Sequence, residues 1–392
     1  MKVKTFLIRA LKILSILLAI FFFISLSQKY IFRYNNRDSL RVDGFRMEEK
    51  DSLDVVLLGS SEIYSAFSSA YAYDLCGFTS YPYAVAAGPV TLWKTMLEET
   101  LSRQTPQLIV VEINGVVYNK PASLHSNAAM HYILDSMPLS KNKIETINRL
   151  CDSNTDSKSC FYFPIIKYHS GWQDIENLGA NYANMRQMQK RGHTLLRGVS
   201  STPVIDPVSN GVRDLTDDYS QRPLAKEAEQ YLREFLEYCR QKDLNVLFVR
   251  FPHRISSSDN DPIYRCFQVT NMAGEIIEEY GYSFINLERN AAEIGLDPEQ
   301  DFYNSNHLNI FGQRKFTKYF SQYLVDNYGV TPGEHSKDLS AGWDESAEYY
   351  QLYCQYVEER MNSGSSSAIA ETAGLVSRLN EIKAQKTGGT DA

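Results

Sequence analysis

The sequence predicts an α/β domain with a parallel five-stranded sheet, helices on both faces and a helical insertion, preceded by one N-terminal transmembrane helix. Two observations lead to this prediction. Short runs rich in Val, Ile, Leu and Phe alternate with longer segments of helical periodicity, which is typical of a parallel sheet covered on both faces. A basic N-terminus is followed by an apolar run, which is typical of a membrane span or a signal peptide.

Residues 1–33 are predicted to stand outside the folded domain as a membrane anchor. The apolar run Ile13–Leu26 is shorter than the ~20 residues that span a bilayer, but Lys12 and Lys29 on its flanks can extend it by snorkelling. More basic residues precede the run than follow it, which predicts a cytoplasmic N-terminus and a single-pass protein of the cell membrane. A cleaved signal peptide is the alternative. Both interpretations place the remaining chain outside the cytoplasm.

Five short apolar runs bounded by turn residues are the expected strands. They are residues 53–58, a run that ends near Val85, and residues 108–113, 246–251 and 282–287. The first expected helix begins at Glu62. The others occupy residues 90–103, 223–242, 268–280 and 311–328. Because these strands and helices alternate, residues 51–330 are predicted to form one α/β domain.

The remaining segments complete the predicted organisation. Residues 34–50 are polar and are expected to form a stalk. About 100 residues separate the third strand from the helix before the fourth, which is too long for a loop. Residues 120–220 are therefore predicted to be a helical insertion, with 161–172 as its apolar anchor. Residues 331–392 are predicted to form a helical C-terminal tail.

Charge and cysteine content exclude some classes of protein. The net charge is −7, from 47 acidic and 40 basic residues, which argues against nucleic acid as a partner. The six cysteines form no CxxC pair, so no zinc or redox site is expected, and no metal or cofactor is predicted. Cys151 and Cys160 lie in one polar loop. They could form a disulfide in an oxidising compartment, or all six cysteines could be thiols.

Small or polar residues follow each of the first three expected strands, at the sheet edge where open α/β folds bind ligands. Ser61, within Gly59–Glu62, lies at a strand-to-helix turn that exposes its hydroxyl, although a serine there can simply cap the helix. Gly88 could offer its N–H to an oxyanion, and Asn114 its side-chain amide. Each could equally be an ordinary turn residue.

A fourth polar segment, residues 301–312, lies just before the last expected helix of the domain. His307 in this segment is the candidate general base, because an imidazole can take the proton of a serine hydroxyl. Asp301 and Asn304 lie upstream of it, and either could orient the ring. Ser61 and His307 are therefore predicted to be a nucleophile and its base.

In this order, the four segments resemble the SGNH (GDSL) hydrolase superfamily. Its members carry a serine, a glycine and an asparagine after successive strands, and an Asp-x-x-His before the last helix. The resemblance covers residues 53–118 and 245–325 and implies a three-layer, flavodoxin-like fold. It also implies catalysis by the serine and histidine named above. The implied oxyanion hole consists of the Ser61 N–H, the Gly88 N–H and the Asn114 amide.

The membrane-anchored GSSE variant also resembles D-alanyl-lipoteichoic acid transfer proteins and the SGNH proteins of polysaccharide O-acetylation. The sequence departs from the superfamily pattern at Ser60, which replaces an aspartate, and at Glu112 and Gly115 in the third block. Asn304 stands where the acid of Asp-x-x-His is expected, and an amide stabilises an imidazolium less well than a carboxylate does. Either Asp301 substitutes for that acid, or Asn304 orients a Ser–His dyad.

The predicted function is a membrane-anchored serine esterase or O-acyltransferase acting on an envelope glycopolymer, such as a teichoic acid or polysaccharide, or on another acylated carbohydrate. Arg250, His253 and Arg254 follow the fourth strand and could bind an anionic polymer, or could form an ordinary charged loop. Two alternatives belong to other classes. One is an accessory protein with an impaired site, favoured by Asn304, that binds glycopolymer or a membrane-bound O-acyltransferase. The other is a glycan-binding structural module.

Overall fold

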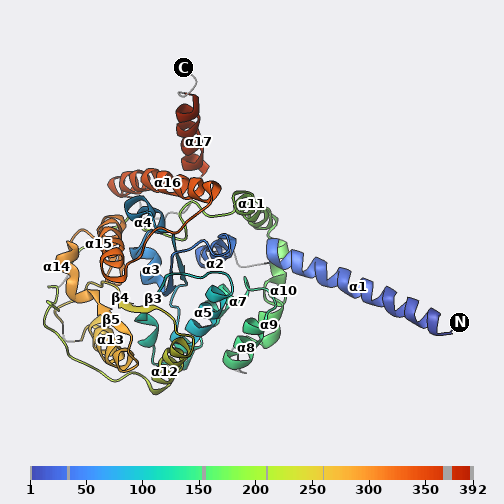
Figure 1. The fold of residues 1–392 in the computed structure, drawn as a ribbon, viewed down its shortest axis with the longest axis horizontal. Coiled ribbons are helices and arrows are strands. Elements are labelled where there is room, and N and C mark those ends of the chain that lie inside the picture. Colours follow the sequence, from blue (N-terminus) through green and yellow to red (C-terminus); the bar gives the residue numbers. More distant parts are fainter. Residues whose placement is uncertain are drawn as a thin grey trace.

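A five-stranded, all-parallel sheet lies at the centre of the fold, in the order β2-β1-β3-β4-β5 (Figure 1). The computed structural model describes residues 2–32, 36–151, 156–208, 211–258, 260–364 and 373–388. The strands are β1 (Val55–Gly59), β2 (Ser80–Ala84), β3 (Leu108–Glu112), β4 (Val246–Arg250) and β5 (Ser283–Asn286). The predicted α/β class with a parallel five-stranded sheet is confirmed.

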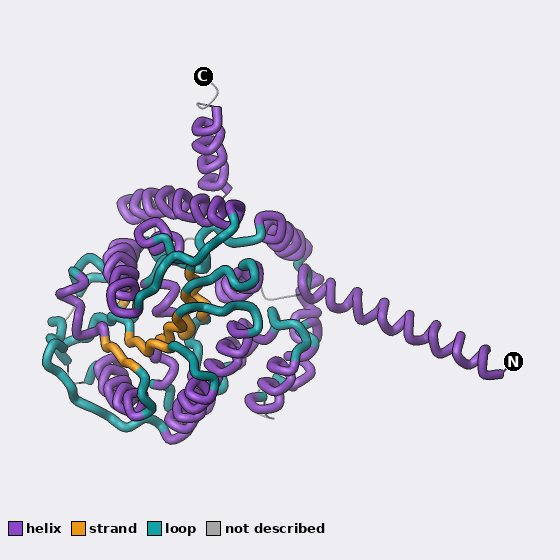
Figure 2. Tube along the Cα trace, viewed as in Figure 1, coloured by secondary structure: helices purple, strands orange, loops and turns teal. Residues whose placement is uncertain are grey.

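Helices cover both faces of the sheet, and Figure 2 shows the strands enclosed by them. Successive side chains of a strand point to opposite faces, so Val56 and Leu58 join one apolar cluster and Val55 and Leu57 join the other. The first face carries α2 (Arg37–Met47), η1 (Val90–Leu92), α5 (Trp93–Leu101), η2 (Ile113–Val116), α12 (Lys226–Gln241) and α13 (Pro262–Glu279). The second carries α3 (Ser61–Ala66), α4 (Ser69–Cys76), α14 (Ala291–Ile294) and α15 (Ile310–Tyr328). The short helix η4 (Leu287–Asn290) follows β5.

A small antiparallel pair of strands, β6 (Phe302–Asn304) and β7 (His307–Leu308), precedes α15. In this pair Asn304 lies opposite His307. The sequence predicted only a polar segment here, because two very short strands carry no readable periodicity. The pairing fixes the backbone that carries both side chains.

The region predicted as a helical insertion is helical in its first two thirds. Its helices are α6 (Pro121–Leu124), α7 (Asn127–Leu134), α8 (Lys141–Leu150), α9 (Lys158–Tyr162), α10 (Ile165–Tyr168), η3 (His169–Gln173) and α11 (Ile175–Arg191). The described residues from 192 to 225 contain no helix. Within this stretch the Ser200 N–H donates to Tyr64 O at 3.0 Å, and the Asp206 N–H donates to Phe302 O at 2.9 Å. This stretch therefore lies beside α3 and β6.

The N-terminal helix α1 (Lys2–Tyr30) extends away from the domain (Figure 1). Its residues Val3–Tyr30 are long and apolar enough to cross a membrane, and their most apolar 18 residues have a mean hydropathy of 2.5 and are not buried inside the protein. A signal sequence would meet the same criteria. The helix is longer than the apolar run from which it was predicted, because the helical pattern continues through the flanking basic residues.

The predicted stalk at residues 34–50 is wrong, because helix α2 packs against the sheet there. Val42 and Phe45 are fully buried in the core. Asp38 and Arg41 form an internal ion pair at 2.9 Å, and both are buried. The polar composition suggested a solvated linker, but two apolar residues three positions apart are enough to bury one face of a short helix.

The C-terminal tail is helical, as predicted, with α16 (Lys337–Asn362) and α17 (Ala373–Gly388). Helix α16 packs on α4, where the rings of Tyr71 and Tyr350 stack with centroids 5.6 Å apart. Cys151 and Cys160 are not bonded to each other, so the thiol alternative is the one observed.

Candidate active site

Ser61 and His307 are in contact at the carboxyl edge of the sheet. Ser61 begins α3 directly after β1, and His307 begins β7. His307 Nε2 lies 2.8 Å from Ser61 Oγ, although the residues are 246 positions apart. This distance is that of a hydrogen bond. The structure therefore brings together the nucleophile and base predicted from sequence.

Asn304 orients the imidazole of His307. Its Oδ1 accepts a hydrogen bond from the Asn306 N–H at 2.8 Å and lies 3.0 Å from His307 Nδ1. The backbone N–H can only donate, so the side-chain oxygen must face it. His307 Nδ1 then carries the proton and donates to that oxygen, which leaves Nε2 as the acceptor for the Ser61 hydroxyl. This is the tautomer that a general base requires.

Asp301 does not occupy the orienting position. Its Oδ2 accepts hydrogen bonds from Lys315 Nζ at 2.7 Å and from the Asp297 N–H at 2.6 Å. Asp301 precedes β6, and in the pairing of β6 with β7 it is Asn304 that lies opposite His307. The position that orients the ring therefore belongs to Asn304.

The environment of His307 keeps its ring neutral. Burial lowers the pKa of His307 below its ordinary value of 6.5. The Tyr303 ring stacks on the imidazole with centroids 5.2 Å apart. A neutral ring can accept a proton from serine, so the lowered pKa suits a base. The sequence prediction missed Tyr303, although an aromatic residue beside Asn304 was the available signal.

Of the predicted oxyanion-hole donors, the Gly88 N–H is already engaged, and the Asn114 amide uses one of its two N–H groups. The Asn114 Nδ2 donates to Glu62 Oε1 at 2.6 Å, and Asn114 Oδ1 accepts from Arg250 Nη1 at 2.6 Å. The Gly88 N–H donates to Val85 O at 3.1 Å. The expectation that Gly88 is an open donor is therefore not met. The Ser61 N–H lies in the first turn of α3, where amides have no partner within the helix.

Two glycines have a packing role instead. A Cβ atom on Gly88 would lie 2.6 Å from Gly59 O, and one on Gly115 would lie 2.7 Å from Gly88 O. Both distances are too short for any side chain. Glycine at these positions lets the turns after β1, β2 and β3 pack backbone against backbone, which gathers their side chains at one edge.

The predicted polymer-binding residues are buried, which corrects that prediction. Arg250, His253 and Arg254 are only 1%, 6% and 8% exposed. Arg250 Nε and His253 Nδ1 lie 3.1 Å and 2.9 Å from Glu288 Oε1, and Arg254 pairs with Asp206. The position of a residue at the end of a strand predicts which edge of the sheet it occupies, but not how deeply its side chain is buried. Here the neighbouring loops cover all three side chains.

A buried charge cluster lies beneath Ser61 and His307. Its acids are Glu62, Glu112 and Glu288, and its bases are Arg250 and His253. Each acid lies at or just after the end of a strand, β1, β3 and β5 respectively. The sequence prediction treated Glu112 only as a departure from a motif and did not consider Glu288. Their shared position at strand ends was the missed signal.

Glu62 and Glu112 have opposite pKa shifts. Burial raises the pKa of Glu62, but the hydrogen bond from His253 and the positive charges of His307, His253 and Arg250 outweigh it and lower the pKa to about 2. Burial and the negative charge of Glu62 raise the pKa of Glu112 to about 7. Glu62 is therefore ionised near neutral pH, while Glu112 binds a proton readily.

Ser60 links the two carboxyl groups. Its Oγ lies 2.8 Å from Glu112 Oε2 and contacts Glu62 Oε2. A hydroxyl carries one proton, so when it donates to ionised Glu62 it must accept from Glu112. Glu112 also accepts from the Asn114 N–H at 2.7 Å through Oε1. All of these bonds are satisfied when Glu112 is protonated.

Replacing Glu112 with glutamine is expected to remove a pH-dependent loss of stability. Glutamine reproduces the hydrogen bonds of protonated Glu112, with Nε2 donating to Ser60 and Oε1 accepting from Asn114. The folded pKa of Glu112 is above its ordinary 4.5. Its stabilising contribution is thus complete below about pH 4.5 and is lost as pH rises through about 7. Urea unfolding should show that Glu112→Gln is more stable than wild type at pH 8. The free-energy difference between variant and wild type should be on the order of 2 kcal/mol larger at pH 8 than at pH 5.

This account would be contradicted if the free energy of unfolding of Glu112→Gln differed from that of wild type by the same amount at pH 5 and at pH 8. Exposed Glu299 provides the control. Glu299→Gln removes the same charge from a solvated side chain and should change the pH dependence little.

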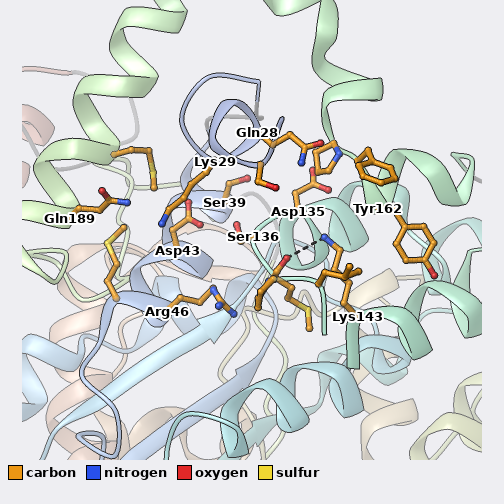
Figure 3. A pocket seen from close by; sticks show the side chains of 18 of the residues that line it. Gln28, Lys29, Ser39, Asp43, Arg46, Asp135, Ser136, Lys143, Tyr162 and Gln189 are labelled. Atoms are coloured by element: carbon orange, nitrogen blue, oxygen red, sulfur yellow. Dashed lines mark hydrogen bonds between the residues drawn. The ribbon is translucent and has the colours of Figure 1, made fainter. Parts of the chain in front are cut away.

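A cavity of about 490 Å³ lies away from the catalytic pair, between the end of α1, helix α2 and the helices α7, α8, α9 and α11 (Figure 3). Lys143 lines it and donates from Nζ to Met137 O at 3.2 Å. Burial lowers the pKa of Lys143 to about 8. None of the predicted site residues lines this cavity, so the candidate active site is the one at the strand ends.

Within the described ranges, no group of His, Cys, Asp and Glu residues is arranged to hold a metal ion. The arrangement of Ser61 and His307 needs no such ion for acyl transfer. The sequence was also compared with known proteins. No protein-family model matches it, and no curated protein shows significant similarity to it.

Proposed function

We propose that the protein is a membrane-anchored SGNH-type serine esterase or O-acyltransferase in which Ser61 carries the acyl group. One observation carries the proposal: Ser61 Oγ lies 2.8 Å from Nε2 of a histidine whose other nitrogen is held by Asn304 at 3.0 Å. A hydroxyl, a base in contact with it and a third group that orients the base are the parts of a serine nucleophile.

The reaction follows from this arrangement. His307 Nε2 takes the proton of Ser61 Oγ while that oxygen attacks the carbonyl carbon of an ester. The tetrahedral intermediate collapses as the ester C–O bond breaks, and His307 returns the proton to the departing alcohol. Water or an acceptor hydroxyl then attacks the acyl-serine and gives its proton to His307. The Ser61 ester bond breaks as His307 passes that proton back to Ser61 Oγ. Hydrolysis and transfer differ only in the second attacking hydroxyl.

The Ser61 N–H and the Asn114 amide are the groups that would donate hydrogen bonds to the tetrahedral intermediate and stabilise it. One oxyanion-hole donor contributes roughly 2.7–4 kcal/mol. The Asn114 amide nitrogen has two N–H groups; one donates to Glu62 Oε1, and the other would donate to the oxyanion.

The proposed substrate is an acylated envelope glycopolymer, such as a teichoic acid or a polysaccharide. The support is the resemblance described above, together with an N-terminal helix apolar enough to cross a membrane. We place the domain outside the cytoplasm, anchored in the cell membrane, where a membrane-bound O-acyltransferase would be its partner. Because Arg250, His253 and Arg254 are buried, they are not proposed to contact the polymer.

A second candidate function is a non-catalytic accessory protein that binds glycopolymer or a membrane-bound O-acyltransferase. The observation in its favour is that the Gly88 N–H and one of the two Asn114 amide N–H groups already have acceptors within the protein. A site that does not bind an oxyanion would still hold a polymer hydroxyl or ester.

A fluorophosphonate probe distinguishes the two candidates. The full chain in detergent should be labelled covalently, because the probe reports an activated serine. Ser61→Ala should abolish the labelling completely, and Ser102→Ala, at the end of α5 and away from the site, should retain it. Mass spectrometry of the adduct should locate it on Ser61. A folded wild-type chain that is not labelled would exclude the enzyme and favour the accessory protein.

A further inference from the structure

Glu62 lies against the catalytic pair. Its Oε2 is 3.5 Å from Ser61 Oγ, and that serine oxygen is in turn 2.8 Å from His307 Nε2. The Ser61 hydroxyl donates over the shorter distance, to His307, because hydrogen bonds weaken with length. Because both groups contact the same serine oxygen, the carboxylate lies near the imidazole. Their separation is close to the distance of about 4–6 Å over which one charge shifts the pKa of another.

The site needs a negative charge that Asn304 does not supply. When His307 takes the serine proton it becomes an imidazolium. Burial lowers the pKa of His307 and so disfavours that charged form. A carboxylate at the position of Asn304 would offset this effect, but an amide has no charge to do so. Glu62 has the opposite effect to burial, since its charge raises the pKa of His307.

The carboxylate of Glu62 is held in one place. Asn114 Nδ2 donates to it at 2.6 Å, Ser60 Oγ contacts it, and His253 Nε2 lies 3.5 Å away. The side chain is only 4% exposed. A buried carboxylate fixed by three polar contacts acts on a neighbouring charge without having to reorganise when that charge forms.

We propose that Glu62 supplies the negative charge that stabilises protonated His307, while Asn304 only fixes the tautomer and direction of the ring. The two roles that one aspartate performs in a Ser-His-Asp triad are thus divided between two residues on opposite sides of the imidazole. This inference rests on the proposed function. His253 is the opposing charge that faces His307, and Tyr303 is the ring stacked on it.

The first test measures His307 without requiring activity. The full chain, labelled with ¹³C-histidine and held in detergent, is titrated by NMR, and the His307 signal is assigned from His307→Gln. Glu62→Gln should lower the pKa of His307. The matched control Glu299→Gln removes the charge of an exposed glutamate and should leave the His307 pKa as in wild type. An unchanged His307 pKa in Glu62→Gln would overturn the proposal, whether or not the protein is an enzyme.

The second test measures hydrolysis of an activated acyl ester. Glu62→Gln should lower kcat by about 10²-fold, within the usual range for general acid–base effects, and should move the acidic limb of the pH profile to lower pH. Adding Asn304→Asp to Glu62→Gln should restore most of the activity, because the introduced carboxylate accepts the same hydrogen bonds as the Asn304 oxygen and returns the negative charge.

The outcomes separate the two proposals. A Glu62→Gln chain with normal thermal unfolding, an unmoved acidic limb and no rescue by Asn304→Asp would show that the charge of Glu62 does not act on His307, and would overturn the inference. Faster hydrolysis in Glu62→Gln would show that the carboxylate acts mainly against the oxyanion, and would equally overturn the inference. A shifted His307 pKa in a protein without esterase activity would uphold the link between Glu62 and His307 while refuting the proposed function.

Discussion

Replacing His307 with alanine is expected to lower kcat/KM for an activated acyl ester by about 10⁴–10⁶-fold, the range seen when a member of a serine triad is removed. His307 Nε2 is the atom 2.8 Å from the serine oxygen, and without it the hydroxyl has no neutral base in contact to take its proton. Ser61→Ala should cause a loss of the same size. Initial rates of ester hydrolysis across pH 5–9 measure both.

The double variant Ser61→Ala/His307→Ala gives the decisive comparison. Residues that act as one unit are strongly non-additive, so the double variant should be no slower than either single variant. If the two losses multiplied instead, the residues would act independently, and the proposed nucleophile and base would be rejected. Thermal unfolding of each variant confirms that the fold is intact.

The positions of the strands along the chain were predictable because buried parallel strands read as continuous apolar runs. β3, for example, is Leu-Ile-Val-Val-Glu, with every residue buried. Ser61 could be placed at the carboxyl edge because parallel strands end at the same edge of a sheet. His307 lies on the separate β6–β7 pair, and its pairing with Ser61 was inferred from its polar segment and from the resemblance. Helix α2 was not predictable in the same way, since its polar residues have partners distant in sequence: Arg41 Nε donates to Gly198 O, and Arg46 pairs with Glu99.

The third member of the site could not be chosen from sequence for a similar reason. Whether Asp301 or Asn304 reaches His307 depends on whether the chain between them is helical or extended, and short strands such as β6 give no periodicity from which to judge. The depth of Arg250 depends on loops that cover it. Sequence therefore predicts which residues share an edge, while burial and hydrogen bonding decide what each one does there.

Replacing Arg250 with methionine is expected to destabilise the fold by about 3–5 kcal/mol, the cost of removing one partner from a buried ion pair. Arg250 Nε lies 3.1 Å from Glu288 Oε1, and its Nη1 lies 3.9 Å from Glu112 Oε1 and donates to Asn114 Oδ1 at 2.6 Å. The arginine and both acids are almost wholly buried. Methionine fills similar space but leaves the carboxylates without a compensating charge. Urea unfolding at pH 7 measures the loss.

The pH dependence of this loss provides a check on its electrostatic origin. The charge of Arg250 lowers the pKa of both Glu62 and Glu112, so its removal raises both. A carboxyl group whose folded pKa rises loses stabilising contribution as pH increases, and the deficit of Arg250→Met should be larger at pH 8 than at pH 5. Arg240, on the surface and paired with Glu237, is the matched control, and Arg240→Met should change stability by no more than about 0.5 kcal/mol. A deficit that is the same at both pH values would mean that lost packing, and not unpaired charge, destabilises the variant.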